Sequence, residues 1–148
     1  MTMQAHDLEI FADYFQFYVQ DADTEENFDE GWTDETVAAM FVSKNTALAI
    51  GTARNMDVPV RLEIHESRPA EPDGWERQNT APLAVNSGRL QVIGCTDYGP
   101  DAFVASIAPG DYLVRVFYFD LETLSEDGLD GDDRYLIQMW PARPPFRH

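Results

Sequence analysis

The hydrophobic pattern of this chain is mostly that of short β-strands. From Val58 to Ile64 every second residue is apolar and the positions between them are mostly polar, which is typical of a strand with one buried face. Residues 112–119 are apolar on nearly both faces and rich in aromatic and β-branched side chains, so we expect a central strand there. Pro59 has no backbone N–H to donate, and it predicts an edge position or a bulge within its strand.

Turn signals and changes of phase divide the rest of the chain. The apolar residues change phase between Ile10 and Phe15, which predicts a bulge near residues 12–14. Asn86-Ser87-Gly88 predicts a hairpin, and Ala108-Pro109-Gly110-Asp111 predicts a turn before the central strand. The remaining strands are expected at residues 47–53, 75–80, 89–95, 102–107 and 135–140.

One short helix is predicted in the N-terminal third of the chain. Thr33 offers a hydroxyl as N-cap, Asp34 and Glu35 suit the positive end of the helix dipole, and we expect the helix to end near Met40. Closely spaced strands with so little helix predict a mainly β fold, an antiparallel β-sandwich of about eight short strands. The 148 residues suffice for one core, so we expect a single domain over residues 1–148.

The charge of the chain is strongly negative and unevenly distributed. The sequence contains 27 Asp and Glu residues but only 10 Lys and Arg residues, a net charge of −17. Such a surface repels nucleic acids and anionic membranes and attracts basic proteins or divalent cations. Residues 1–43 contain eleven Asp and Glu residues and no Lys or Arg, and residues 120–133 contain seven acidic residues and no basic one. Both segments are interpreted as acidic loops on one globular unit.

The single cysteine, Cys95, excludes an internal disulfide and a zinc site built from several cysteines. Its apolar neighbours predict a buried thiol. The first nine residues contain no basic residue and no apolar segment of signal-peptide length, and the chain has no run of about 18 apolar residues. We therefore expect a cytoplasmic protein without membrane insertion.

Only one candidate catalytic residue, His65, lies on a well-defined predicted strand. His65 lies near Glu63 and Glu66, so a carboxylate can orient its imidazole in a hydrolase, the third and weakest hypothesis. The sequence contains no Gly-x-Ser-x-Gly elbow, no Cys-x-x-Cys pair and no phosphate-binding glycine loop. Residue 65 falls on the polar side of its strand, which favours a surface histidine. We expect no catalytic residues, no cofactor and no enzymatic activity.

The loop Asp127–Asp133 offers hard oxygen ligands around two glycines, a composition suited to calcium. Its spacing does not fit a helical calcium loop, because neither Asp127 nor Asp130 starts a run with ligands at the first, third and fifth positions and a glutamate at the twelfth. An ordinary solvated connection is favoured, and we assign no metal site. A calcium- or carbohydrate-binding sandwich that uses this loop is the alternative function.

The acidic N-terminal segment also suits a surface that imitates a polyanion. Carboxylates on a rigid β-scaffold can occupy the positions that phosphates take in a basic partner's groove, and Trp32 and Phe28 are candidate aromatic anchors. The alternative is that the acids serve solubility and that both aromatic side chains cover the core. The residues alone favour neither interpretation.

Several segments resemble one family. Tyr14-Phe15-Gln16-Phe17, Gly31-Trp32-Thr33-Asp34-Glu35, Ala53-Arg54-Asn55 before the strand through Ile64, and residues 107–112 keep the family's order and approximate spacing. The chain resembles competence protein J, the DNA-entry nuclease inhibitor, over about residues 7–140. The resemblance implies a small acidic β-rich protein that binds and inhibits a DNA-degrading nuclease in bacterial competence.

The leading hypothesis is therefore a non-enzymatic protein-binding module that inhibits a nuclease by occluding its basic DNA groove. The partner is expected to be a basic protein and not a nucleic acid. Trp32 is expected at the centre of the contact. The acidic residues expected to face the groove are Asp21, Asp23, Glu25, Glu26, Asp29, Glu30, Asp34 and Glu35.

Overall fold

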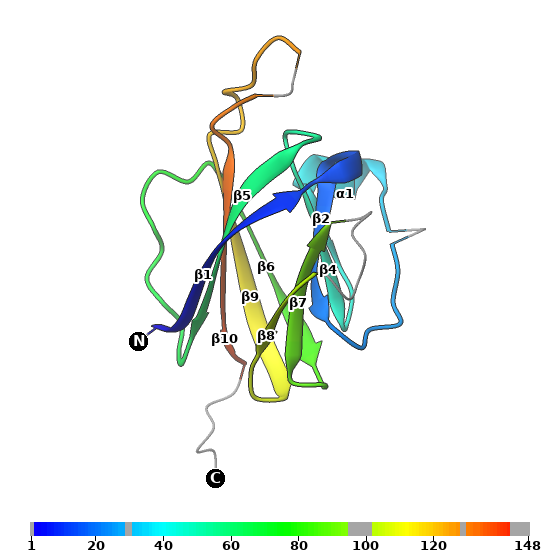
Figure 1. Cartoon of the computed structure of the whole chain (residues 1–148), viewed down its shortest axis with the longest axis vertical. Coiled ribbons are helices and arrows are strands. Elements are labelled where there is room, and N and C mark those ends of the chain that lie inside the picture. The colour runs from blue at the N-terminus through cyan, green and yellow to red at the C-terminus, as the bar shows by residue number, and fades with distance from the viewer. Residues whose placement is uncertain (1, 29–30, 95–101, 128–129, 143–148) are drawn as a thin grey trace.

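The computed structural model describes residues 2–28, 31–94, 102–127 and 130–142. Two β-sheets pack face to face in it, with one short helix beside them (Figure 1). The first sheet has the order β1 (Thr2–Phe11), β5 (Asp57–His65), β10 (Arg134–Pro141), β9 (Gly110–Phe119) and β6 (Arg77–Val85). The second has the order β3 (Phe41–Ser43), β4 (Ala47–Gly51), β2 (Gln16–Asp21), β7 (Arg89–Gly94) and β8 (Phe103–Ser106).

The predicted mainly β sandwich is confirmed, with ten strands in the described residues instead of about eight. The short β3 is a strand that the hydrophobic pattern did not predict. One pair, β5 and β10, runs parallel, from Val60 opposite Tyr135 to Ile64 opposite Met139. Parallel neighbours need a long crossover, and here β6 to β9 lie between the two strands in the chain.

Alternating apolar positions on both sheets form the core. Along β5, Val58, Val60, Leu62 and Ile64 are at most 2% exposed, as the period of two predicted. The facing sheet contributes Phe17, Val19, Leu48, Ile50, Leu90 and Val92 to the same cluster. Burying each such side chain stabilises the fold by about 1.5–3 kcal/mol relative to exposure. The two inner faces therefore hold the sandwich together.

Pro59 lies in an interior strand, so the predicted edge position is wrong for β5 as a whole. β5 pairs with β1 at Pro59, opposite Glu9, but its ladder with β10 begins only at Val60. At Pro59 itself, β5 is thus paired on one side only. This local arrangement tolerates a residue that cannot donate to a second ladder.

The central strand β9 is covered on both faces, which explains its nearly continuous apolar sequence. Arg115, the charged exception, is 1% exposed on the outer face of the sheet. Its guanidinium lies between the rings of Phe117 and Trp140, about 5 Å from each centroid, and donates to the Pro69 carbonyl and to Gln138 Oε1. The segment after β5 therefore folds back over this face.

The expectation of a surface histidine is wrong. His65 is 6% exposed, and its Nε2 lies 2.9 Å from Glu63 Oε1. Burial acts to raise the pKa of the Glu63 carboxyl, but hydrogen bonds from Arg61, His65 and Gln138 outweigh burial and lower that pKa. The position falls on the polar side of the strand, but the histidine is buried beside the partly buried Glu63.

Two predicted local features are in fact passages from one sheet to the other. The phase change after Ile10 is not a bulge: β1 ends in the first sheet, the 3₁₀ turn η1 (Asp13–Phe15) follows, and β2 begins in the second. The turn at residues 86–88 is not a hairpin, because β6 and β7 belong to different sheets. Turn residues indicate a reversal but not which strand the chain then pairs with.

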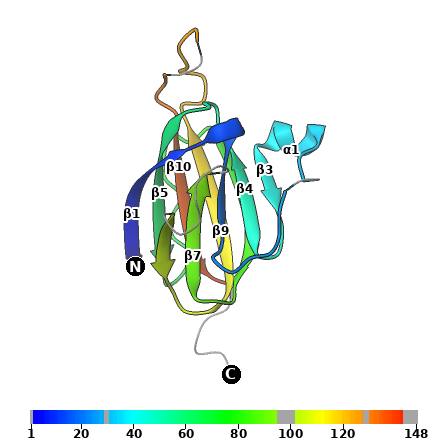
Figure 2. The same cartoon turned by 45° about the vertical axis from the view of Figure 1, so that its right-hand side comes forward.

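The predicted helix is confirmed as α1 (Asp34–Ala39), which lies beside β3, the edge strand of the second sheet (Figure 2). Thr33 is its N-cap: the Thr36 amide donates to the Thr33 hydroxyl, and the Thr33 amide donates to Thr36 Oγ1 at 2.7 Å. Met40 ends the helix in the left-handed conformation, with φ of 60°. Thr33 thus sets where α1 begins, and Met40 sets the path of the chain into β3.

No helix of the described residues is long and apolar enough to cross a membrane. Cys95 lies outside the described residues, so the expected burial of its thiol stays a prediction.

Asp21 fastens the crossing between β6 and β7 to the end of β2. It is 3% exposed, and its carboxylate accepts hydrogen bonds from the amides of Asn86 and Ser87 and from the Ser87 hydroxyl. The amide of Asp23 donates to it as well. The carboxylate therefore joins the end of β2 to the crossing between the two sheets.

We expect Asp21→Ala to lower the free energy of unfolding by about 2 kcal/mol, because it leaves buried amides unpaired. Asp23→Ala is the matched control: Asp23 forms an exposed ion pair with Arg89, and its loss should cost well under about 1 kcal/mol. Urea unfolding monitored by tryptophan fluorescence measures both. Equal losses for the two variants would contradict the anchoring role of Asp21.

Candidate protein-binding surface

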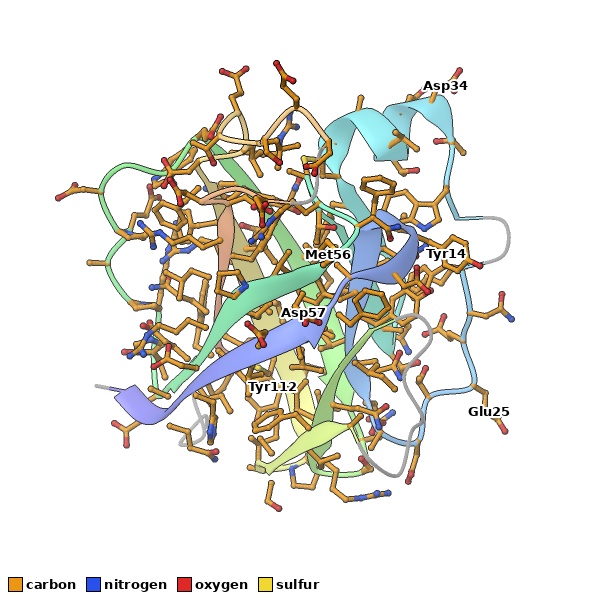
Figure 3. All side chains as sticks on the ribbon, turned by 45° about the horizontal axis from the view of Figure 1, so that its top comes forward. Tyr14, Glu25, Asp34, Met56, Asp57 and Tyr112 are labelled. Atoms are coloured by element: carbon orange, nitrogen blue, oxygen red, sulfur yellow. The ribbon has the colours of Figure 1, made fainter. Side chains whose placement is uncertain are left out.

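The acidic residues of the N-terminal segment differ in how they lie. Asp23, Glu25, Glu26, Asp34 and Glu35 are exposed, whereas the Asp21 carboxylate is buried against the 86–88 crossing and does not face solvent. Asp29 and Glu30 lie outside the described residues. Figure 3 shows Glu25 and Asp34 projecting outward on the side of the molecule that carries Tyr14. We use the name acidic surface for these five exposed acids, Asp23, Glu25 and Glu26 on the loop after β2 and Asp34 and Glu35 at the start of α1 (Asp34–Ala39).

The loop that carries the first of these acids is held against the turn between β3 and β4. Glu26 accepts hydrogen bonds from the amide and the hydroxyl of Thr46, and the Thr24 and Thr46 hydroxyls are 2.6 Å apart. The side-chain hydrogen bond from Thr46, with that from its amide, holds the pKa of the Glu26 carboxyl below its usual range. The acidic surface is therefore carried on a loop with defined contacts.

The two aromatic residues considered as anchors, Phe28 and Trp32, have different roles. Phe28 is 8% exposed, stacks on Tyr18 with the ring centroids 5.0 Å apart, and packs against Val42 and Ala49. It covers the outer face of the second sheet, so for Phe28 the core interpretation holds. Trp32 is half-buried: it packs against the Phe28 cluster, and its Nε1 donates to Gln16 Oε1 at 3.0 Å. Trp32 is the aromatic residue of the pair that reaches the surface.

An apolar groove opens beside Trp32, between η1 and α1. It has a volume of about 540 Å³. The two sides come from the 13–15 turn and from the helix, and the floor comes from the ends of β2 and β4. We call this the η1–α1 groove and define it by its lining residues: Tyr14, Phe15, Gln16, Trp32, Val37, Met40, Gly51 and Thr52.

The turn that forms one wall of the groove has an unusual backbone. Tyr14 and Phe15 both have positive φ, 58° and 61°, although neither is glycine. This left-handed conformation costs about 1–2 kcal/mol for an ordinary residue. Hydrogen bonds hold it in place: the Phe15 amide donates to the Ala12 carbonyl, and the Phe15 carbonyl accepts from the Thr52 amide at 2.9 Å. Both aromatic side chains consequently point outward, 68% and 53% exposed.

The sequence pattern did not indicate Tyr14 and Phe15 as surface residues. Phe15 shares the apolar phase of Phe17 and Val19, which predicts burial on the same face. The reversal in η1 removes it from that face. Two adjacent aromatic residues at the point where the phase changes were the available signal, because a sheet-to-sheet crossing is the place where the alternation stops.

In the acidic loop considered as a calcium site, the carboxylate of Asp133 is buried and already bound by other side chains. Asp133 is 0% exposed; Arg54 Nε donates to its Oδ1, and the Tyr135 hydroxyl donates to its Oδ2 at 2.6 Å. Burial and this neighbouring carboxylate raise the pKa of the Tyr135 hydroxyl. In the part of the chain that the structure describes, no group of three or more His, Cys, Asp or Glu side chains is placed to hold a metal ion. Gly128 and Leu129 lie outside that part.

Comparison with protein families gives a match to the model of competence protein J over residues 9–139. The chain belongs to the competence protein J family. The resemblance found in its sequence motifs is thereby confirmed. A comparison with curated protein sequences gives no match.

Two solved structures share the fold of this family member. One is competence protein J of Bacillus subtilis, an inhibitor of the DNA-degrading activity of NucA, with a TM-score of 0.70 and 19% sequence identity over 96% of this chain and 98% of that one. The other is the protein of crocagin biosynthetic gene J, with a TM-score of 0.64 and 16% identity over 95% and 98% of the two chains. At these identities the similarity shows the fold.

We expect Tyr14→Gly to raise the free energy of unfolding by about 1 kcal/mol, because glycine adopts positive φ without the steric cost that tyrosine bears. The exposed side chain contributes little burial, so its removal should not offset this gain. Chemical unfolding of the two proteins measures the difference. A loss of stability in Tyr14→Gly would show that the tyrosine ring contributes to the fold itself.

Proposed function

We propose that this member of the competence protein J family is a binding protein that inhibits a DNA-degrading nuclease, without enzymatic activity of its own. The support is the family match over residues 9–139 together with the fold shared with the Bacillus subtilis inhibitor of NucA. The observation that carries the mechanism is the acidic surface beside the half-buried Trp32, on a chain with a net charge of −17.

Inhibition proceeds by occlusion of the partner's DNA-binding groove. A nuclease binds the phosphates of DNA through basic side chains, and exposed carboxylates on a fixed scaffold present the same sign of charge. The first 43 residues contain no Lys or Arg, and among the described residues the positive charges that the fold places against the acidic surface are Arg89, which pairs with Asp23, and Lys44 near Phe28. Such a field accelerates the encounter of the two proteins, and an aromatic contact then slows their separation.

The direct test is DNA cleavage by a purified nuclease encoded in the same genome, preferably by a neighbouring gene, with increasing amounts of this protein. We expect stoichiometric suppression of cleavage that weakens as salt is raised from about 0.05 M to 0.5 M, because exposed charges are screened over about 8–10 Å at moderate salt. A nuclease that is not inhibited at any salt concentration, by a folded protein in excess, would contradict the proposal.

A pair of quadruple variants tests whether the position of the charge matters. Asp23→Asn, Glu25→Gln, Asp34→Asn and Glu35→Gln together should slow association by about tenfold or more at low salt. The matched control neutralises four exposed acids of the other acidic segment: Glu122→Gln, Glu126→Gln, Asp130→Asn and Asp132→Asn. Stopped-flow association rates measure both. Equal slowing would assign the effect to net charge alone.

Trp32→Ala tests the aromatic contact. We expect it to weaken nuclease binding by about 2 kcal/mol, as the loss of a central aromatic side chain does in other interfaces. Because Trp32 also packs against the Phe28 cluster, the variant must retain a cooperative unfolding transition. Trp32→Phe, which keeps the packing, should bind with intermediate affinity in isothermal titration. A folded Trp32→Ala with unchanged affinity would exclude Trp32 from the contact.

A further inference from the structure

We propose that the η1–α1 groove is the point where the partner inserts an apolar side chain flanked by Lys or Arg, with Tyr14, Phe15 and Val37 as the contact residues. The inference rests on the proposed function and gives it a specific site. It places the centre of the contact in the groove, with Trp32 in the groove wall and with Asp34 and Glu35 on the helix that forms one of its sides.

Exposure is the first observation that supports this site. Eight large apolar side chains are exposed in the described residues, and the three most exposed are Tyr14 at 68%, Val37 at 61% and Phe15 at 53%. All three line the η1–α1 groove. Single exposed apolar residues are ordinary, but a group of them around one concave surface is typical of an interaction site.

The backbone of η1 is the second observation. A fold selected for stability alone would place glycine or asparagine at positions with φ near 60°, whereas Tyr14 and Phe15 occupy both of them. Strained residues that are also exposed gain nothing from the core. Such strain concentrates at ligand-binding positions, where the side chain needed for binding is kept although its backbone conformation is strained.

The floor of the groove is preformed. The Gly51 amide donates to the Met40 carbonyl at 2.9 Å, and a Cβ at Gly51 would lie only 3.1 Å from Met40 Cα. The strand end and the helix end are thus in close contact, which a larger residue at position 51 would disturb. Gln16 is held by the Trp32 indole from the side. A groove with fixed walls binds at a lower entropic cost than one that must form on binding.

Charge identifies the occupant. Every residue of the groove except Gly51 and Thr52 belongs to the first 43 residues, which contain eleven Asp and Glu residues and no Lys or Arg. Asp13 is adjacent to Tyr14, and Asp34 lies one helical turn before Val37 on the same face of α1. An apolar centre with an acidic rim fits an apolar side chain between basic ones. A nucleic acid or a second copy of this −17 chain would be repelled.

The test uses Tyr14→Gly with Phe15→Gly, because glycine removes both side chains and suits both backbone positions. We expect the double variant to stay folded and to bind the nuclease at least 30-fold more weakly, mainly through faster dissociation. Val104→Ala and Leu124→Ala are the controls, since both remove exposed apolar side chains outside the groove. They should bind as the parent does.

A folded double variant that binds and inhibits within about threefold of the parent would overturn the groove as the site, while nuclease inhibition by the parent would stand. A parent that inhibits no nuclease removes the proposed function, and a peptide probe then decides the groove. The probe is a short peptide of Lys and Arg around one Phe, compared with its Phe→Ala analogue.

The peptide is titrated into the ¹⁵N-labelled protein. Shifts of the Tyr14, Phe15 and Val37 amide signals with the Phe peptide, weaker with the Ala analogue and absent in the double variant, support the site. No shift with either peptide overturns it. Light scattering tests whether a second copy of this chain occupies the groove instead. Self-association that grows with salt and is lost in the double variant would assign the groove to a second copy and would overturn the proposal of a basic partner.

Discussion

The packing of two apolar sheet faces against each other is the interaction on which the rest of this structure depends. Because the chain moves between the sheets, it needs crossings at the ends of the sandwich, and those at residues 12–15 and 86–88 connect strands that do not pair. Each crossing is fastened separately, the first by backbone hydrogen bonds around Ala12, Phe15 and Thr52, the second by the Asp21 carboxylate. The candidate binding groove arises at the first of these crossings.

Core burial also allows the groove to carry features that oppose stability. Two left-handed aromatic residues and a set of exposed apolar side chains cost free energy that the apolar cluster of both sheets offsets. Because the core supplies the stability, η1 can be short. It needs only to reverse the chain and present Tyr14 and Phe15 beside α1, while the strands on either side provide the rigid support.

The carboxylates of this acidic protein fall into two physical groups. Asp21 and Asp133 are buried, and their oxygens accept hydrogen bonds from a crossing turn and from Arg54 and Tyr135. Their role is structural, since a buried carboxylate must find donors within the fold. The acidic surface carries its charge in solvent, where it acts over distance on a partner. Local sequence does not separate the groups, because members of both stand in the same acidic segments.

The sequence by itself determined the mainly β class, the strands at Val58–Ile64 and at residues 112–119, the capped helix after Thr33 and the family, because alternation, capping and motif order are local properties of the chain. Only the tertiary structure decided which strands pair, that β5 and β10 run parallel, and that His65 and Asp21 are buried. It alone placed Tyr14 and Phe15 on the surface beside Val37. These features depend on contacts between residues far apart in the chain, and a local pattern carries no information about the segment that will fold against it.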